Sequence, residues 1–289
     1  MLEKLLRDVI QNIEQQKKVH DEINTLRQEI SVLKKDLIKS QTRSKWEAID
    51  IWHEFRYSDC QISCRICDYK DHINNFKKLI AQCMFEGGKL ERYECPQCGL
   101  IFGPLKFLLL DETSLANEYK HLYEIYAEPD TTDYEVRTFM ALNPKKDGIY
   151  LNYGSGAWSN SIRILREQGW NIFGYEPYVS PNNSFTTNKE DAVASTKFDG
   201  IFSHNLIEHV QDPLQLFQFM KSLLRDNSCK MAHSTACYNY AAEHTRFHVH
   251  FFTGKSIDYL CDKVGLQITN KAHDKSTGYI NYVYEIKNP

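Results

Sequence analysis

Residues 149–159, IYLNYGSGAWS, constrain the fold of this chain more than any other stretch. An apolar run ends at Gly154 and Gly156, and residues 160–168 follow with helix-like spacing. Strand, glycine turn and helix in this order are typical of a parallel α/β sheet that binds a nucleotide-like ligand, because glycine allows tight turns and close ligand approach. The pattern also occurs in ordinary strand-to-helix turns, so the downstream sequence has to decide between the two interpretations.

A second strand-like run, residues 170–175, ends in Glu176. This position lies about one βα unit after the glycines, where a carboxylate can accept hydrogen bonds from both hydroxyls of a ribose. The alternative is an exposed charge at the end of a strand.

A third strand is predicted further along the chain. Residues 198–203 read as a buried strand, and the polar pair His204 and Asn205 follows at its carboxyl end. Because parallel strands end at the same edge of a sheet, this pair points to the same crevice as the glycines. The stretch between Glu176 and residue 198 is rich in turn-forming residues and leaves room for a short strand, residues 184–187.

Composition limits the partners and the location. A chain of 289 residues can bury a sizeable core and suggests two or more domains. A net charge of −3 provides no basic face, so we expect no nucleic-acid partner. The most apolar short run, residues 99–110, is too short to span a bilayer, and the first residues lack the apolar core of a secretion signal. These features predict a cytoplasmic protein whose paired cysteines bind metal rather than form disulfides.

Residues 1–45 contain no glycine or proline and carry an apolar heptad repeat. The a positions are Leu2, Val9, Gln16, Ile23, Ile30 and Leu37, and the d positions are Leu5, Asn12, Val19, Leu26, Leu33 and Ser40. A seam of this length predicts a coiled coil, and β-branched residues at a with leucine at d favour a parallel dimer. We therefore expect a homo-oligomer held by this segment. The alternative is one amphipathic helix that packs on its own domain.

Two Cys-x-x-Cys pairs follow in residues 46–110, which we interpret as a second module. Cys64 pairs with Cys67, and Cys95 pairs with Cys98. Each pair offers two sulfurs on one turn and tetrahedral Zn²⁺ needs four, so the spacing predicts a zinc ribbon with structural zinc. The alternatives are a redox dithiol and core cysteines without metal.

Residues 111–289 are expected to form the third domain, which begins with a helical segment, residues 111–145. Aromatic side chains recur in this segment at helical spacing, which more often indicates core packing than ligand contact. Because the segment directly precedes the glycine strand, it is also a candidate lid over the ligand, with Tyr123 and Tyr126 as contacting residues.

Three phrases of the sequence resemble a known family. NYGSGAWS, GYEP and FDGIFSHNLIEHVQDP are similar to the first, second and fourth motifs of class I S-adenosylmethionine-dependent methyltransferases. EHVQDP at residues 208–213 is similar to the branch that acts on small molecules and sugars, and a cysteine module ahead of such a domain resembles sugar methyltransferases with an N-terminal zinc-binding domain. The resemblance implies an α/β fold, with a Rossmann-like class I methyltransferase domain preceded by a four-cysteine zinc ribbon and an N-terminal α-helical coiled coil.

The resemblance also implies roles for individual residues. Gly154 and Gly156 would lie against the methionine part of the cofactor, S-adenosylmethionine, and Glu176 would hold its ribose. His204 and Asn205 would face the cofactor near the methyl group that is transferred.

Two features depart from the family pattern. Asn152 stands where the family usually has an acidic residue, so the amide can still hydrogen-bond the cofactor but the cofactor's ammonium lacks a charge partner there. The stretch after Glu176 is short, so the usual helix and an acidic residue that contacts adenine could be missing.

Residues 241–254 are the predicted substrate side of the site. They contain His244, His248 and His250, and the last two share one face if the segment is extended. Methyl transfer to oxygen or nitrogen benefits from a base near neutral pH, so these histidines are candidate catalytic bases. Each could instead be a hydrogen-bonded structural residue, and together they could bind zinc.

We therefore expect a methyltransferase that moves a methyl group to a hydroxyl of a sugar, a nucleotide-linked sugar or a surface-glycan precursor. The glycan assignment follows from the resemblance. The other hypothesis is a scaffold of zinc ribbon and coiled coil whose methyltransferase-like domain has lost activity, which Asn152 and the short stretch after Glu176 would explain.

Overall fold

The structure is a computed structural model that describes residues 2–127, 129–156, 159–178, 183–240 and 244–287. The side chains of residues 2–5 and 7–9 are not described. The side chains of the predicted heptad residues Leu2, Leu5 and Val9, and the first part of the predicted histidine segment, residues 241–243, therefore lie outside the described parts.

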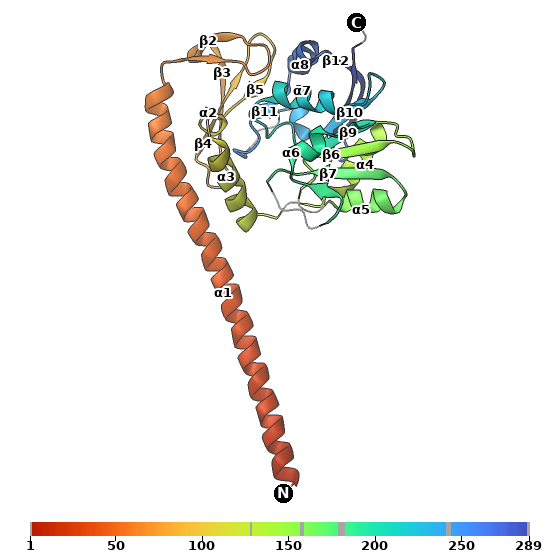
Figure 1. The fold of residues 1–289 in the computed structure, drawn as a ribbon. Coiled ribbons are helices and arrows are strands. Elements are labelled where there is room, and N and C mark those ends of the chain that lie inside the picture. The colour runs from red at the N-terminus through yellow and green to blue at the C-terminus, as the bar shows by residue number, and fades with distance from the viewer. Residues whose placement is uncertain (1, 128, 157–158, 179–182, 241–243, 288–289) are drawn as a thin grey trace.

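The N-terminal part of the chain is a single helix, α1 (Leu2–Tyr57), which extends away from the body of the protein (Figure 1). Its 56 residues span about 84 Å. The exposed apolar side chains at the predicted heptad positions are Val19, Ile23, Leu26, Ile30, Leu33 and Leu37. The helix does not end near residue 45, where the predicted coiled coil ends, but continues for about three more turns and docks on the body through the buried Trp46.

The cysteine module consists of short antiparallel strands. One hairpin pairs β1 (Gln61–Ser63) with β2 (Lys70–His72), and a 3-10 turn, η1 (Ile73–Asn75), follows. A four-stranded sheet has the order β11-β5-β4-β3 and contains β3 (Lys77–Gln82), β4 (Lys89–Glu94), β5 (Ile101–Phe102) and β11 (His250–Phe251). Its edge strand β11 comes from the histidine segment near the C-terminus, so this sheet is built from both the second and the third predicted regions.

The large sheet has seven strands in the order β12-β13-β10-β9-β6-β7-β8. The strands are β6 (Ile149–Tyr153), β7 (Asn171–Tyr175), β8 (Thr186–Thr187), β9 (Gly200–His204), β10 (Lys230–Ser234), β12 (Leu266–Asp274) and β13 (Tyr279–Ile286). Neighbouring strands from β10 across to β8 pair in parallel, and β13 is antiparallel to both of its neighbours. The chain runs from β6 outward to β7 and then returns to β9 on the other side, which creates a crevice at the carboxyl end of β6.

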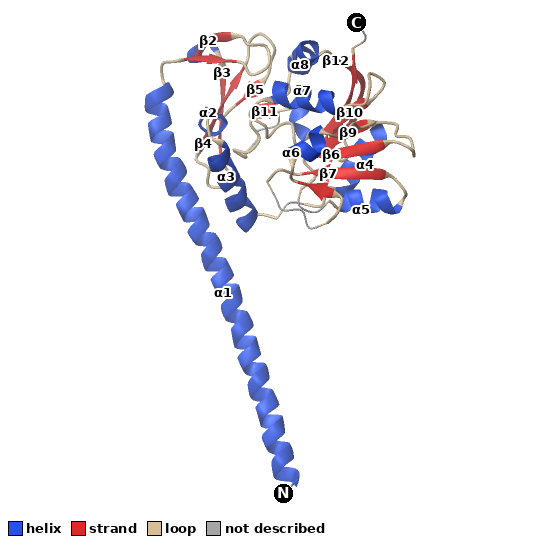
Figure 2. Ribbon diagram, in the orientation of Figure 1, coloured by secondary structure: helices blue, strands red, loops and turns tan. Residues whose placement is uncertain are grey.

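Helices cover both faces of this sheet (Figure 2). They are α4 (Thr132–Ala141), α5 (Asn160–Glu167), α6 (Glu190–Ala194), α7 (Pro213–Leu223) and α8 (Ser256–Val264). Two further helices, α2 (Leu105–Leu108) and α3 (Glu112–Ile125), contact α1 beside the cysteine module, and a 3-10 turn η2 (Ala236–Tyr238) contacts β11 and β13. The short α6 lies where the sequence suggested that a helix could be missing, so a helix is retained there. Among the described residues, no helix is long and apolar enough to cross a membrane.

Two hydrophobic cores hold these layers together. The smaller core joins α4 and α5 to one face of the sheet through Phe139, Ile162 and Phe202. The larger core joins α7 and α8 to the other face and runs without interruption into the cysteine module, where it includes Phe76 and Phe102. Because the two modules share one core, the cysteine module is fixed against the crevice side of the protein.

Candidate functional site

The predicted glycine loop lies at the carboxyl end of the central strand β6. Gly154 and Gly156 have φ angles of +79° and +69°, which glycine adopts without strain. The N–H of Gly154 donates to the carbonyl of Tyr175 over 2.8 Å and ties the loop to the end of β7. A Cβ added to Gly156 would meet no atom within 4 Å, so the loop faces open space at that point. The loop therefore has room for a ligand close to its backbone.

Glu176 follows directly after β7 and is half-buried beside the glycine loop. Its carboxylate accepts hydrogen bonds from the N–H of Gly156 over 3.2 Å and from the N–H of Tyr178 over 3.3 Å. A ribose held against the loop would lie within reach of this carboxylate. The two parts of the predicted cofactor site are thus adjacent in the fold.

Asn152 is fully buried near the end of β6, and its side chain is hydrogen-bonded. Its Nδ2 donates to the carboxylate of Glu135 on α4 over 2.8 Å. The same carboxylate accepts from Ser159 and Ser161, at the start of α5, over 3.0 and 2.6 Å. The structure therefore provides an acidic group beside the position where the sequence has an amide, and the sequence analysis did not find it because Glu135 lies on another element.

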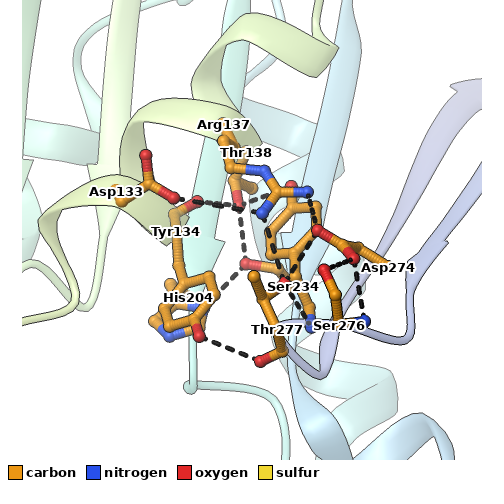
Figure 3. Close-up of polar contacts among 10 residues, drawn as sticks. Asp133, Tyr134, Arg137, Thr138, His204, Ser234, Asp274, Ser276 and Thr277 are labelled. Atoms are coloured by element: carbon orange, nitrogen blue, oxygen red, sulfur yellow. Dashed lines mark hydrogen bonds and ion pairs between the residues drawn. The ribbon is translucent and has the colours of Figure 1, made fainter.

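His204 and Asn205 lie at the carboxyl end of β9, as the sequence predicts. Nδ1 of His204 is 2.8 Å from the hydroxyl of Ser234 on β10, and the ring stacks on Tyr134 of α4 (Figure 3). The Ser234 hydroxyl is in turn hydrogen-bonded to the hydroxyl of Thr138, with the two oxygens 2.6 Å apart. Burial lowers the pKa of His204 to about 4, so the ring is neutral at pH 7. Asn205 is exposed, so this pair presents uncharged polar groups at the rim of the crevice.

The predicted helical lid, residues 111–145, forms two helices, of which α4 packs against β9 and β10 of the large sheet. The other helix, α3, carries Tyr123 and ends just before Tyr126. Tyr123 has about half of its surface exposed and stacks on Tyr119, whereas Tyr126 packs against Phe85 of the cysteine module. Tyr119 also stacks on Tyr178, which follows β7, with ring centroids 6.3 Å apart. Helix α3 thus lies next to the Glu176 side of the crevice. The sequence analysis did not single out Tyr119 or Tyr178, because a tyrosine alone carries no signal of what it faces.

Glu208, His209 and His248 form a cluster in which one ligand atom from each residue lies within 4.8 Å of the others. Nδ1 of His209 is 3.1 Å from the carbonyl of Phe247. The hydroxyl of Tyr119 also lies 3.1 Å from this nitrogen. Because a carbonyl only accepts, the Phe247 contact favours the tautomer with the proton at Nδ1 and a lone pair at Nε2. Burial lowers the pKa of His209 well below its ordinary value, and His248 lowers it further. The imidazole of His209 is therefore uncharged near neutral pH.

The structure separates the three histidines that the sequence predicted as bases. His248 belongs to the cluster, and its ring lies 4.8 Å from that of His209. His250 is fully buried on β11, and burial lowers its pKa to about 3. His244 is exposed and accepts a backbone hydrogen bond from Met84 of the cysteine module. His209 was overlooked although it stands in the EHVQDP phrase, because the phrase does not show which residues it faces.

The four predicted metal ligands converge on one point. Sγ of Cys64 and Cys98 lie 3.5 Å apart, as do those of Cys67 and Cys95, and all four sulfurs lie within 4.8 Å of one another. Four sulfurs at about 2.3 Å from one tetrahedral zinc ion would be about 3.8 Å apart, so the arrangement fits a metal of this size. The nine cysteines are free thiols in the structure.

A buried charged cluster fixes α1 against the site. We call it the α1–α3 junction, formed by Lys45, Trp46, Glu118 and Arg246. The carboxylate of Glu118 accepts from Lys45 over 2.6 Å, from the indole of Trp46 over 3.1 Å and from Arg246 over 3.0 Å. Glu118 and Arg246 precede Tyr119 and Phe247, which contact His209, so the junction supports the neighbours of the histidine cluster.

Comparisons with known proteins agree with this geometry. Residues 133–271 match the sequence model of a family described as "Methyltransferase domain". A solved structure with a similar fold is 1,6-didemethyltoxoflavin-N1-methyltransferase of Burkholderia thailandensis, bound to 1,6-didemethyltoxoflavin and S-adenosylhomocysteine. It is 12% identical, the match covers 69% of this chain and 96% of that one, and the TM-score is 0.50.

Two further solved structures are similar at lower scores. The CcbJ methyltransferase of Streptomyces caelestis is 13% identical over 62% of this chain and 100% of that one, with a TM-score of 0.45. Magnesium protoporphyrin IX methyltransferase of Synechocystis PCC 6803 is 14% identical over 62% and 100%, with a TM-score of 0.44. No curated protein matches the sequence.

Residues 133–271 therefore form a class I methyltransferase domain, and the protein is an S-adenosylmethionine-dependent methyltransferase. The open space at Gly156 and the adjacent Glu176 carboxylate fit this cofactor. The four cysteines lie outside the matched residues and belong to the module in front of the domain.

Proposed function

We propose that the enzyme methylates a hydroxyl of a sugar, a nucleotide-linked sugar or a surface-glycan precursor, with His209 as the base. The geometry of His209 is the observation that carries this proposal, because a proton at Nδ1 leaves Nε2 able to take one from the acceptor. A hydroxyl needs such a base more than a neutral amine does, because the amine already has a nucleophilic lone pair, whereas the hydroxyl becomes a good nucleophile only as its proton is removed. The cysteine module and the EHVQDP phrase support a sugar, because both resemble sugar methyltransferases.

In this mechanism the residues of the chain bind, orient and deprotonate. S-adenosylmethionine would supply a methyl group bonded to a sulfonium sulfur. The acceptor oxygen would bond to the methyl carbon as the carbon–sulfur bond breaks, and S-adenosylhomocysteine would leave. Gly154, Gly156 and Glu176 would hold the cofactor so that the acceptor oxygen and the methyl carbon are aligned. His209 would take the hydroxyl proton at Nε2, and the carboxylate of Glu208 would stabilise the imidazolium that forms.

The assay of His209 measures S-adenosylhomocysteine release with a panel of nucleotide-linked sugars. His209→Asn should lower the rate about 10²–10⁴-fold and leave cofactor affinity unchanged. His244→Asn is the matched control, because His244 is exposed and outside the cluster, and it should retain the full rate. A His209 variant with wild-type turnover would contradict the assignment of His209 as the base.

The cluster could instead hold a metal ion, and metal content separates the two roles. With His209 as the base, wild type and His209→Asn should contain the same amount of metal per chain. A metal ion lost together with the His209 side chain would assign the cluster to metal binding. Because His250 has no exposed surface, we do not assign it the proton transfer.

The folded chain gives less reason than the sequence to propose an inactive scaffold. Glu135 provides a carboxylate beside Asn152, and α6 is present after β8. Titration calorimetry with S-adenosylmethionine tests the scaffold hypothesis directly, because an inactive domain without a cofactor site would give no heat at millimolar concentrations.

We also propose that Cys64, Cys67, Cys95 and Cys98 bind one structural zinc ion. The four thiolates would close the coordination shell, which is typical of zinc that stabilises a fold. Cys98→Ser should lose the zinc and lower the melting temperature. Cys60→Ser is the control, because Cys60 lies near the module but outside the cluster. Equal zinc content in both variants would contradict this ligand set. Free thiols and a zinc–thiolate site are consistent with a reducing cytoplasm.

The exposed stripe of α1 supports the proposed homodimer. Leu26, Leu33 and Leu37 each expose more than half of their surface, and a parallel partner helix would cover them. A shortened chain that begins at Asp36 would lose Leu26 and Leu33 from this stripe but keep the docked end of α1. Sedimentation should show two chains per particle for the full-length protein and one for the shortened chain, and a shortened chain that still sediments as a dimer would rule out pairing through the stripe.

A further inference from the structure

We propose that Glu135 is a cofactor-binding residue that supplies the negative charge for the ammonium of S-adenosylmethionine in place of an acid at Asn152. The inference rests on the cofactor placement given under the proposed function. It concerns a helix residue outside the three phrases that resemble the methyltransferase motifs.

The carboxylate of Glu135 is hydrogen-bonded to residues on both sides of the glycine loop. One oxygen, Oε2, accepts from Asn152 before the loop and from Ser159 and Ser161 after it. The other, Oε1, accepts from Thr131 over 3.0 Å. The carboxylate therefore lies next to the segment that carries Gly154 and Gly156, and it reaches this position from α4 rather than from β6.

The charge of Glu135 is not neutralised by the protein. All four hydrogen-bond donors to its carboxylate are uncharged, and within the described residues it forms no salt bridge. The arginine two residues further along α4, Arg137, pairs with Asp133 and Asp274 instead. Hydrogen bonds from neutral donors fix the direction of a carboxylate but leave its field acting on a nearby cation.

The cofactor carries its ammonium at the end opposite the adenosine. With the ribose at Glu176 after β7, the amino-acid end would extend toward β6 and the glycine loop, because these two strand ends are neighbours. This places the ammonium on the side of the crevice where Glu135 lies. In a partly buried crevice, opposite charges a few ångströms apart attract more strongly than in water.

Titration calorimetry with three ligands tests this role. They are S-adenosylmethionine, S-adenosylhomocysteine and 5′-methylthioadenosine, which lacks the amino-acid end. Glu135→Gln should weaken the first two about tenfold, as expected for loss of a charged hydrogen-bond partner, and leave the third unchanged. Asp133→Asn is the control on the same helix, because Asp133 is exposed, and it should change none of the three.

A charge swap completes the experiment. In the double variant Glu135→Gln with Asn152→Asp, both replacements keep the shape of the side chain and the charge moves across one hydrogen bond of 2.8 Å. We expect this variant to regain most of the lost affinity for the two amino-acid ligands.

Two results would overturn the inference. An equal loss for all three ligands would mean that Glu135 only shapes the loop, and unchanged affinity for all of them would remove it from the site. Both differ from failure of the cofactor assignment itself, in which the wild-type protein would bind none of the ligands.

Discussion

Two glutamates, Glu118 in the α1–α3 junction and Glu135 beside the glycine loop, differ in whether their hydrogen-bond partners are charged, and this difference determines whether the carboxylate can attract a ligand. Glu118 is almost fully buried and is paired with two cations, Lys45 and Arg246. Glu135 is half-buried and is bonded only to neutral donors. A carboxylate that is already balanced by cations can hold elements together but has little left to offer a ligand. One held by neutral groups keeps its charge available.

Glu118→Gln should have the largest effect on stability. The change leaves Arg246 buried without a full counter-charge, and breaking a buried ion pair costs about 3–5 kcal/mol of unfolding free energy. Chemical denaturation followed by tryptophan fluorescence measures this, since Trp46 lies in the junction. Glu124→Gln on the exposed face of the same helix should stay within about 0.5 kcal/mol. A loss for Glu118→Gln as small as that of the control would mean that the junction does not anchor α1.

The contribution of Glu118 should also depend on pH. Burial alone would raise its pKa, but Arg246 and Lys45 lower the pKa below its ordinary value of 4.5. A group with a lowered pKa stabilises the fold above its unfolded pKa and loses this contribution as the pH falls through the folded pKa. The difference in unfolding free energy between wild type and Glu118→Gln should therefore be constant above about pH 5 and shrink below it. A difference that grows in acid would contradict this sign.

Glu135→Gln should cost less stability than Glu118→Gln. The amide keeps one acceptor oxygen and the same shape, and it strands no buried cation, so we expect about 1–2 kcal/mol. The same denaturation experiment measures it, with Asp133→Asn as the reference. If the two glutamine variants lost equal stability, the contrast between a structural and an available carboxylate would not hold.

Removing the free part of α1 should have the smallest effect. The chain that begins at Asp36 keeps Trp46 and the junction, so its body should unfold within about 0.5 kcal/mol of the full-length protein. A chain that begins after Tyr57 lacks the junction residues Lys45 and Trp46 and should be much less stable. A large loss in the first variant would show that the exposed stripe also supports the body.

Local patterns predicted the elements that depend on nearby residues. The glycine loop, Glu176 and the four cysteines lie where the sequence places them, because each is fixed by a turn or strand end within a few residues. The long N-terminal helix also follows from its local composition, although it extends through residue 57 rather than stopping near residue 45. Its end could not be found from the heptad pattern, because the last turns are held by the junction rather than by the seam.

Contacts between distant segments could not be predicted in the same way. His209 meets His248 and Phe247 across about 40 residues, and strand β11 joins a sheet whose other strands lie in the cysteine module. No periodicity in the sequence reports such a pairing. For this reason the three candidate histidines were treated as one group, whereas the fold buries one, exposes another and brings the third to His209.

The sequence by itself determined the class of domain, since strand ends and glycine turns are local features that survive without knowledge of the fold. Only the tertiary structure decided how charge is distributed around the site. Asn152 looks like the loss of an acidic group when the chain is read in order. In the fold it donates to Glu135, because α4 packs against β9 and α5 and brings the carboxylate to the glycine loop. Packing, not sequence position, determines which groups share a site.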